Sequence, residues 1–372
     1  MTTSIATPSI SVQELVSMLE SPDPVTVLDI RSREDRASWS IPGSMHVDAG
    51  DPLRAGEPGV LDQLVLPAGV PVVAVCAAGN TSAIATEQLR ARGIEAYSLT
   101  GGMNAWSLAW DAVEVPLPQA DFTLLQVRRL GKGCLSYLVA SGDEAAVIDP
   151  SIETDAYIQV AEQHGWTITW VLETHIHADH LSRARALADK TGATLGLPPQ
   201  RRVSFPFQPI EPGERIRIGE VGLEAISTPG HTLESTSYRF GDQALFTGDT
   251  LFLTSVGRPD LEANAAEARK RAAFLYRSLG HLSSLPGTLL VLPGHADAIA
   301  LDNRPIVRSL SDVLPTLDLL RLSETAFVDE VLARIPPTPP NHHEIVHHNE
   351  QGDPPVDDPA SLEAGANRCA IA

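Results

Sequence analysis

Three histidines and one aspartate lie within six residues of the sequence. The segment His175-Ile176-His177-Ala178-Asp179-His180 follows an apolar run that we expect to form a strand, and an expected helix comes after it. Side chains alternate along an extended segment, so His175 and His177 project to the same side. Imidazole and carboxylate groups are ligands of zinc, manganese and iron alike. The spacing therefore predicts a metal centre at the end of this strand.

Three later segments offer further ligands for the same centre. Each has a histidine or an aspartate in a glycine-bearing turn directly after an apolar run: Pro229-Gly230-His231, Thr247-Gly248-Asp249 and Pro293-Gly294-His295. Glycine in such a turn lets the backbone bring a ligand close to an ion. Two histidine pairs, His342-His343 and His347-His348, lie in a polar stretch near the C-terminus, where we expect surface residues.

A single cysteine, Cys76, ends another apolar run and precedes an expected helix. Small residues after it can aim backbone N–H groups and the helix N-terminus at one sulfur, which stabilises a thiolate or an anionic persulfide. A buried structural cysteine is the alternative. The other two cysteines have plainer interpretations, Cys134 as a core residue in a strand-like run and Cys369 in a tail packed against the second domain. The residues of the predicted cradle are Ala77, Ala78, Gly79, Asn80, Thr81 and Ser82.

The elements that position these residues divide into two halves. In the first, short β-branched runs alternate with segments of helical spacing, which predicts a mostly parallel sheet covered on both faces. The second opens with consecutive strands and then mixes strands with helices, which suggests two sheets with helices outside. We predict domains at residues 1–115 and 121–335, a proline-spaced linker at 116–120 and a tail at 336–372. The tail is expected to pack on the second domain or extend from it, with residues 336–360 loosely ordered.

The composition is that of an ordinary globular protein with an acidic balance. The formal charge of −20 argues against nucleic acid and anionic membranes as bulk partners. The N-terminus has no basic residue and no long apolar stretch, and three widely spaced cysteines fit a reducing compartment. We expect a cytoplasmic protein that binds small molecules, and a homodimer is compatible with the sequence.

Residues 10–112 resemble a rhodanese domain. The resemblance is carried by VLDIRSREDRASWSIPGSMHV, by the Cys76 loop and by LTGGMNAW. In that family the cysteine carries sulfane sulfur as a persulfide, which assigns this role to Cys76 with the amides of residues 77–82 as its cradle. The usual loop has an arginine where this chain has Thr81. The missing cation speaks against thiosulfate as donor and leaves another sulfur donor, or an inactive sensing domain.

The histidine-rich segment and the three later turns resemble the metallo-β-lactamase superfamily over roughly residues 120–300, which implies an αββα sandwich with metals at one edge. Hydrolases of the glyoxalase II kind use all these residues for two metals, zinc or manganese, and a bridging hydroxide. Persulfide dioxygenases bind one Fe(II) through two histidines and one carboxylate, which leaves positions for oxygen and substrate. For that branch the resemblance implies His175, His231 and Asp249 as iron ligands. The residues left as outer-sphere groups or as an unfilled second site are His177, Asp179, His180 and His295.

Three features favour the dioxygenase branch. Gly257-Arg258-Pro259-Asp260 is similar to a stretch in which the arginine lies near the substrate pocket, and the segments at 275–279 and 285–287 also resemble that branch. Fusion to a rhodanese domain is a known arrangement for it. The expected function is oxidation of a thiol persulfide such as glutathione persulfide by O2 to sulfite and free thiol, with Arg258 holding a substrate carboxylate. The alternatives are a binuclear glyoxalase II-like thioester hydrolase and a sulfur-carrier or sensing protein whose metal is structural.

Overall fold

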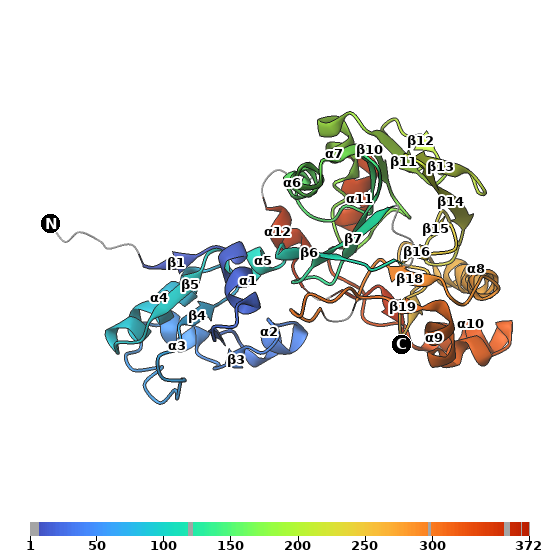
Figure 1. Cartoon of the computed structure of the whole chain (residues 1–372). Coiled ribbons are helices and arrows are strands. Elements are labelled where there is room, and N and C mark those ends of the chain that lie inside the picture. The colour runs from blue at the N-terminus through green and yellow to red at the C-terminus, as the bar shows by residue number, and fades with distance from the viewer. Residues whose placement is uncertain (1–6, 118–121, 297–298, 353–357, 366, 372) are drawn as a thin grey trace.

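The computed structural model describes residues 7–117, 122–296, 299–352, 358–365 and 367–371. The first domain is a five-stranded parallel sheet in the order β1-β5-β4-β2-β3 with helices packed around it (Figure 1). Its two central strands are wholly buried, as the apolar runs predict. Its elements are β1 (Ser9–Ile10), α1 (Val12–Glu20), β2 (Thr26–Asp29), α2 (Arg33–Ser38), β3 (Met45–His46), α3 (Gly50–Arg54), β4 (Val72–Val75), α4 (Asn80–Ala91), β5 (Ala96–Leu99) and α5 (Gly102–Trp106).

The second domain is a sandwich of a seven-stranded and a six-stranded sheet, ordered β12-β11-β10-β9-β8-β7-β6 and β13-β14-β15-β16-β18-β19. The strands of the first are β6 (Trp110–Glu114), β7 (Thr123–Arg129), β8 (Leu135–Ser141), β9 (Glu144–Ile148), β10 (Thr167–Leu172), β11 (Thr194–Leu197) and β12 (Gln208–Pro209). Those of the second are β13 (Arg215–Ile218), β14 (Val221–Ser227), β15 (Thr236–Phe240), β16 (Ala244–Gly248), β18 (Leu290–Pro293) and β19 (Arg308–Ser309).

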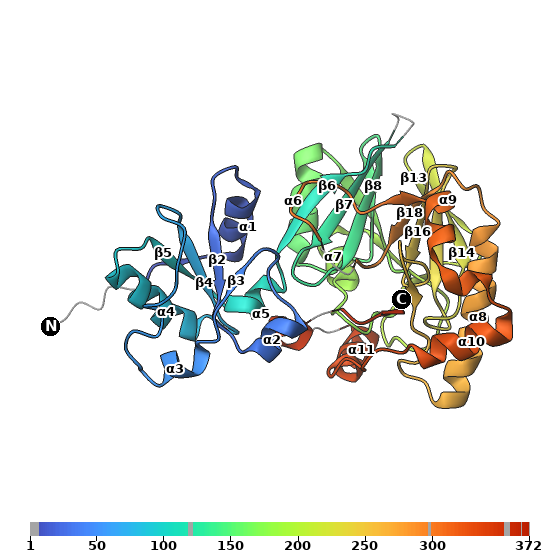
Figure 2. The ribbon, with the colours of Figure 1, turned by 90° about the horizontal axis from the view of Figure 1, so that it is seen from below.

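Helices cover the two outer faces, which completes the predicted αββα order. Helices α6 (Thr154–His164) and α7 (Ala184–Thr191) lie outside the first sheet, and α8 (Ala265–Ser283) and α10 (Glu324–Ala333) lie outside the second (Figure 2). Between the sheets, the rings of Tyr137 and Phe246 meet edge to face with centroids 5.1 Å apart. Short helical turns, α9 (Leu310–Val313), η1 (Leu314–Thr316) and η2 (Asp318–Arg321), connect β19 to α10. No described helix is long and apolar enough to cross a membrane.

The sheet of the second domain begins before the predicted boundary at residue 115. Strand β6 pairs antiparallel with β7, with Ala112 opposite Val127. The predicted linker therefore joins two strands of one sheet, and its residues 118–121 lie outside the described part of the chain.

The C-terminal segment is more ordered than its composition indicates. Within the stretch 336–360 that we expected to be loosely ordered, helix α11 (His342–Gln351) forms, because Ile345, Val346 and Asn349 make one buried face at helical spacing. Residues 353–357 of that stretch lie outside the described part of the chain. His342 is buried as well, against the expectation of a surface residue, whereas His343 is exposed. The chain then forms α12 (Pro359–Glu363) and β20 (Ala370–Ile371), which pairs with β17 (Val256–Gly257). The tail thus packs on the second domain.

A buried carboxylate fixes this tail to both domains. Glu363 on α12 accepts a 2.8 Å bond from Nη2 of Arg129 and further bonds from Nη1 of Arg183 and the backbone N–H of Leu181. Arg129 also donates to the carbonyl of Ser107, directly after α5. Burial alone would raise the pKa of Glu363, but Arg129 and Arg183 hold it below its ordinary value. Glu363 is therefore charged in the folded protein.

Replacing Glu363 by Gln should destabilise the protein by about 3 kcal/mol, because it leaves the buried Arg129 without its counter-ion. The control Glu330→Gln removes a half-exposed partner of Arg334 and should cost less than about 0.5 kcal/mol. Urea unfolding measures both. Because the pKa of Glu363 is lowered in the folded state, its contribution is complete above pH 4.5, the ordinary value, and is lost as the pH falls through the folded value. Equal stability of the two variants at neutral pH would contradict this role.

Candidate metal centre and thiol loop

Three of the predicted metal ligands meet at one edge of the sandwich, each supplied by the loop after a strand. His175 follows β10, His231 follows β14 and Asp249 follows β16. Ligand atoms of these three residues lie within 4.8 Å of one another, and none of the three is more than 2 % exposed. The Oδ2 atom of Asp249 is 3.9 Å from Nε2 of His175 and 3.6 Å from Nε2 of His231. These separations suit one ion bound at about 2.0–2.2 Å from each ligand.

The turn before Asp249 requires glycine. Gly248 has a φ of +48°, and a Cβ there would lie 2.5 Å from Oγ1 of Thr174, the residue before His175. The two ligand loops approach so closely that only glycine fits between them. The close approach explains why the predicted glycine-bearing turn stands at this position.

Several buried ligand atoms have no hydrogen-bond partner among the described residues. They are Nε2 of His175, Nδ1 of His177, Nε2 of His180 and Oδ2 of Asp249. An unpartnered polar atom in the interior is costly, and a metal ion would supply the missing interaction. The donor set and the unpartnered atoms therefore fit a bound metal.

The two histidines of this triad are prepared as neutral ligands. His231 donates from Nδ1 to the carbonyl of Arg258 at 2.8 Å, which leaves Nε2 for an ion. Nδ1 of His175 lies 2.9 Å from Oγ1 of Thr174. Burial holds the pKa of His175 well below its ordinary value and also lowers the pKa of His231. Neutral imidazoles are the form that metal binding requires.

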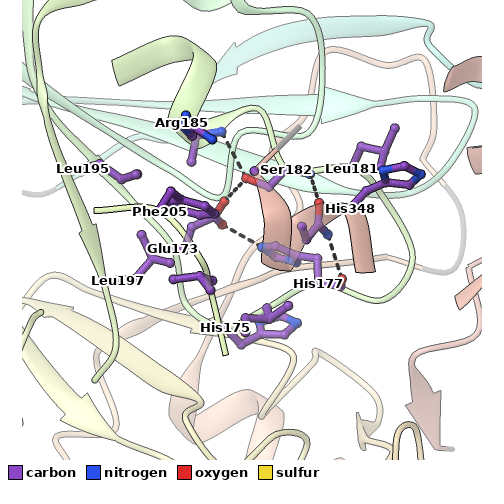
Figure 3. Close-up of a pocket in the computed structure, with 15 residues that line it drawn as sticks. Glu173, His175, His177, Leu181, Ser182, Arg185, Leu195, Leu197, Phe205 and His348 are labelled. Carbon is purple, nitrogen blue, oxygen red and sulfur yellow. Dashed lines mark hydrogen bonds and ion pairs between the residues drawn. The ribbon is translucent and has the colours of Figure 1, made fainter. Parts of the chain in front are cut away.

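His177 is held by two carboxylates that the sequence analysis did not single out. Its Nε2 lies 2.8 Å from Oε2 of Glu173 and 3.3 Å from Oδ1 of Asp149, and Figure 3 shows the bond to Glu173. Burial would lower the pKa of His177, but Glu173 and Asp149 hold it well above its ordinary value. Helix α11 completes this side, because Nδ2 of Asn349 donates to the carbonyls of His177 and His180.

In the second half of the cluster, Asp179 and His295 are bonded to each other and to further protein groups. His295 lies between two carboxylates, with Nδ1 2.7 Å from Asp249 and Nε2 2.8 Å from Asp179. Although burial lowers the pKa of His295, these carboxylates hold it well above its ordinary value. Both ring nitrogens of His295 are therefore engaged by carboxylates of the protein. Asp179 also accepts from Nδ2 of Asn367 at 2.9 Å, and Sγ of Cys134 lies 3.4 Å away.

This half nevertheless contains a second set of possible ligands. Cys134, Asp179, His180 and His295 offer ligand atoms within 4.8 Å of one another. Cys134 is buried, as the sequence predicts for a core residue, and it also lies beside the candidate metal centre. Cys369 lies there too, because its sulfur belongs to a similar group with Asp249 and His295.

The guanidinium of Arg258, which we expected to hold a substrate carboxylate, is engaged by groups of the protein itself. Its guanidinium is fully buried and donates from Nε and Nη2 to Asp260, at 2.8 and 2.7 Å. Nη1 donates to the carbonyls of Pro337 and Arg368. Arg258 instead positions its neighbours: its own carbonyl orients His231, and its guanidinium holds the C-terminal segment.

The predicted thiol loop connects β4 to α4. Cys76 is 6 % exposed, and its Sγ accepts a 3.1 Å bond from the backbone N–H of Gly79 and lies 3.3 Å from Oγ of Ser82. Gly79 has a φ of +89°, and a Cβ there would lie 2.9 Å from the nitrogen of Gly101. Of the predicted cradle, Gly79 and Ser82 thus contact the sulfur directly.

A cavity of about 200 Å³ opens beside this thiol, and four other cradle residues, Ala77, Ala78, Asn80 and Thr81, help to line it. Arg54 at the end of α3 lines it too, and its Nη1 lies 3.5 Å from Oγ1 of Thr81. An arginine from another element thus reaches the position where the loop lacks one. Sequence spacing could not have indicated Arg54, because 27 residues separate it from Thr81.

Comparisons with known proteins agree with both domains. A model described as "Metallo-beta-lactamase superfamily" matches residues 129–295, and one described as "Rhodanese-like domain" matches residues 11–109. The chain is 35 % identical to a hydroxyacylglutathione hydrolase of Acidiphilium cryptum over 47 % of this chain and 68 % of the relative. It is 37 % identical to a hydroxyacylglutathione hydrolase of Rhodospirillum rubrum over 40 % of this chain and 56 % of the relative.

Two solved structures are also similar. A metallo-β-lactamase from Staphylococcus aureus superposes with a TM-score of 0.58 and 26 % identity, over 64 % of this chain and 76 % of that one. ETHE1 from Myxococcus xanthus superposes with a TM-score of 0.54 and 29 % identity, over 60 % of this chain and 96 % of that one.

Replacing Asp249 by Ala should lower the affinity for Fe(II) by at least about 100-fold, because it removes the carboxylate of the triad. Binding is measured by anaerobic titration, with circular dichroism to verify folding. The matched control is Glu262→Gln, which removes a carboxylate beside His342 and His343, outside this cluster. Unchanged iron affinity of Asp249→Ala, or an equal loss in the control, would contradict the ligand assignment.

Proposed function

Because this chain belongs to the metallo-β-lactamase superfamily and has a rhodanese-like domain ahead of the metal-binding domain, we propose that it is an iron-dependent persulfide dioxygenase. The reaction converts a thiol persulfide such as glutathione persulfide, one O2 and one water into the free thiol, sulfite and two protons. The outer sulfur is oxidised from the sulfane state to sulfite, and O2 is the oxidant.

The observation that carries this proposal is the difference between the two halves of the cluster. His175, His231 and Asp249 form two histidines and one carboxylate with ligand atoms free for a metal, the arrangement typical of non-haem Fe(II) oxygenases. His295, which a second metal would need, is bonded to carboxylates through both ring nitrogens. One metal per chain is therefore the arrangement that these contacts favour.

Sequence motifs of the second domain give further support. By structure the chain is similar to ETHE1 of Myxococcus xanthus, and by sequence it is similar to hydroxyacylglutathione hydrolases, so the second domain has relatives of both kinds. The residues around Gly257 and Leu275, which resemble the dioxygenase branch, favour that branch.

In this proposal iron bound by the triad supplies the redox chemistry that joins O2 to the outer sulfur. The protein side chains orient the reaction. His295 holds Oδ1 of Asp249 and thereby leaves Oδ2 directed into the triad. Glu173 and Asp149 hold Nε2 of His177, and the centroid of its ring lies 4.2 Å from that of the His175 ring. The two carboxylates therefore orient this ring beside the triad.

The rhodanese-like domain has a complementary role. Cys76 takes the sulfane sulfur from a persulfide, so that the donor leaves as a free thiol and the cysteine becomes a persulfide. Gly79 N–H and Ser82 Oγ, which already contact Sγ, would stabilise the anionic persulfide. Arg54 would supply the cation that Thr81 does not.

A glutathione thioester hydrolase is the second candidate. It is favoured by the hydroxyacylglutathione hydrolase relatives and by the free ligand atoms Nδ1 of His177 and Nε2 of His180. It would require two metals, and His295 would have to release Asp179 and Asp249.

Fe(II)-loaded protein should consume O2 when glutathione persulfide is added, and it should form one sulfite for each O2. An oxygen electrode with parallel sulfite analysis measures both, against a no-enzyme control and the Asp249→Ala variant. Iron-containing protein that consumes no O2 but hydrolyses a glutathione thioester would overturn the proposal in favour of the second candidate.

Replacing Cys76 by Ser should abolish formation of protein-bound persulfide and leave O2 uptake with free glutathione persulfide within about twofold of wild type. The first effect follows from the loss of the sulfur, and the second from the separate location of the metal triad. Release of thiocyanate on treatment with cyanide measures the bound sulfur. Retention of this cyanide-labile sulfur by the Ser variant would show that another thiol carries it.

A further inference from the structure

The C-terminal segment, residues 367–371, forms part of the wall of the metal centre. Asn367 donates from Nδ2 to Asp179, and Cys369 lies in a group of potential ligands with Asp249 and His295. Its backbone is fixed as well, because the N–H of Arg258 donates to the carbonyl of Cys369 and β20 pairs with β17. Arg368 lies between Asn367 and Cys369 in the chain, and the contacts of these two residues with the metal centre therefore fix its position.

Arg368 lines two cavities, and each of them reaches a residue of the metal cluster. One, of about 200 Å³, is lined by His295, Phe252 and Asn367. The other, of about 140 Å³, is lined by Asp179 and Lys132, and also by Ser38 of the first domain. Each cavity is several times larger than the volume of one water molecule, so each has room for part of a small organic ligand.

The guanidinium of Arg368 makes no hydrogen bond or ion pair with any residue that the structure describes, although its side chain is half-buried. The neighbouring cations are engaged: Nζ of Lys132 donates to the carbonyl of Glu363, and Arg258 is paired with Asp260. A partly desolvated guanidinium presents several parallel donors that match the two oxygens of a carboxylate. In a chain of net charge −20, a free cation beside the reaction centre indicates an anionic ligand.

We propose that Arg368 binds a carboxylate of the thiol persulfide and thereby directs its outer sulfur to the triad of His175, His231 and Asp249. This inference rests on the proposed function and names the substrate class as a thiol that carries a carboxylate. Arg258 serves as a positioning residue, because its Nη1 holds the carbonyl of Arg368 at 3.1 Å. We thus assign to Arg368 the contact with a substrate carboxylate that the sequence predicted for Arg258.

The kinetic test compares a carboxylate-bearing substrate with a neutral one. Arg368→Gln should raise the KM for glutathione persulfide by about tenfold or more and leave kcat and iron content within about twofold of wild type. The same variant should oxidise 2-hydroxyethyl persulfide, which has no carboxylate, with unchanged kcat/KM. Arg368→Lys should recover part of the loss. The control Arg269→Gln alters an exposed arginine paired with Asp329 and should change none of these values.

A binding test separates this proposal from the proposed function. Calorimetry with S-methylglutathione, a non-reacting analogue, requires no turnover. Wild-type protein should bind the analogue, and Arg368→Gln should bind it at least about tenfold more weakly. Equal affinities, no binding to wild type, or an equal loss of kcat/KM for both persulfides would overturn the assignment. Lack of O2 uptake by the wild type would refute the dioxygenase, and the calorimetric comparison would still decide the role of Arg368.

Discussion

The metal centre depends on one imidazole held between two buried carboxylates. His295 joins Asp249 to Asp179, and this bond orients one oxygen of Asp249 toward His175 and His231 while the other is occupied. These two hydrogen bonds engage both ring nitrogens of His295, so neither is left for a second metal. Oδ2 of Asp249 is thereby left to bind an ion, whereas both ring nitrogens of His295 are engaged by the protein, although Nε2 of His180 has no partner among the described residues. The chemistry that we propose follows from this asymmetry.

The tail makes this arrangement possible, because it bonds the metal-binding loop from several directions. Asn349 donates to the carbonyls of His177 and His180. Glu363 accepts from the backbone N–H of Leu181, and Asn367 donates to Asp179. The tail also touches the first domain, where Asn104 on α5 donates to Ser361. Helix α5 in turn bonds the thiol loop, because the N–H of Asn104 donates to the carbonyl of Ala77. The tail therefore contacts both the metal-binding loop and the helix that supports the thiol loop.

The sequence predicted the two domains and the αββα order, because apolar runs, turn glycines and the histidine-rich segment are local signals that resemble known families. The structure brings His175, His231 and Asp249 together, and their binding of a metal stays a prediction. The sequence did not predict the partners that come from distant segments. Asp149 and Glu363 look like ordinary polar residues until the fold buries them, and helix α11 was hidden by a composition rich in polar residues. For Arg258 the motif identified an important arginine, but only the fold shows that Asp260 occupies its guanidinium.

The number of metal ions per chain tests this account most directly. Elemental analysis of protein saturated with Fe(II), after removal of unbound metal, should give one ion per chain, and the sample should remain at one ion when zinc is added in excess. Two ions per chain would mean that His295 releases its carboxylates and coordinates metal. That result would contradict the asymmetry from which the proposed dioxygenase chemistry follows.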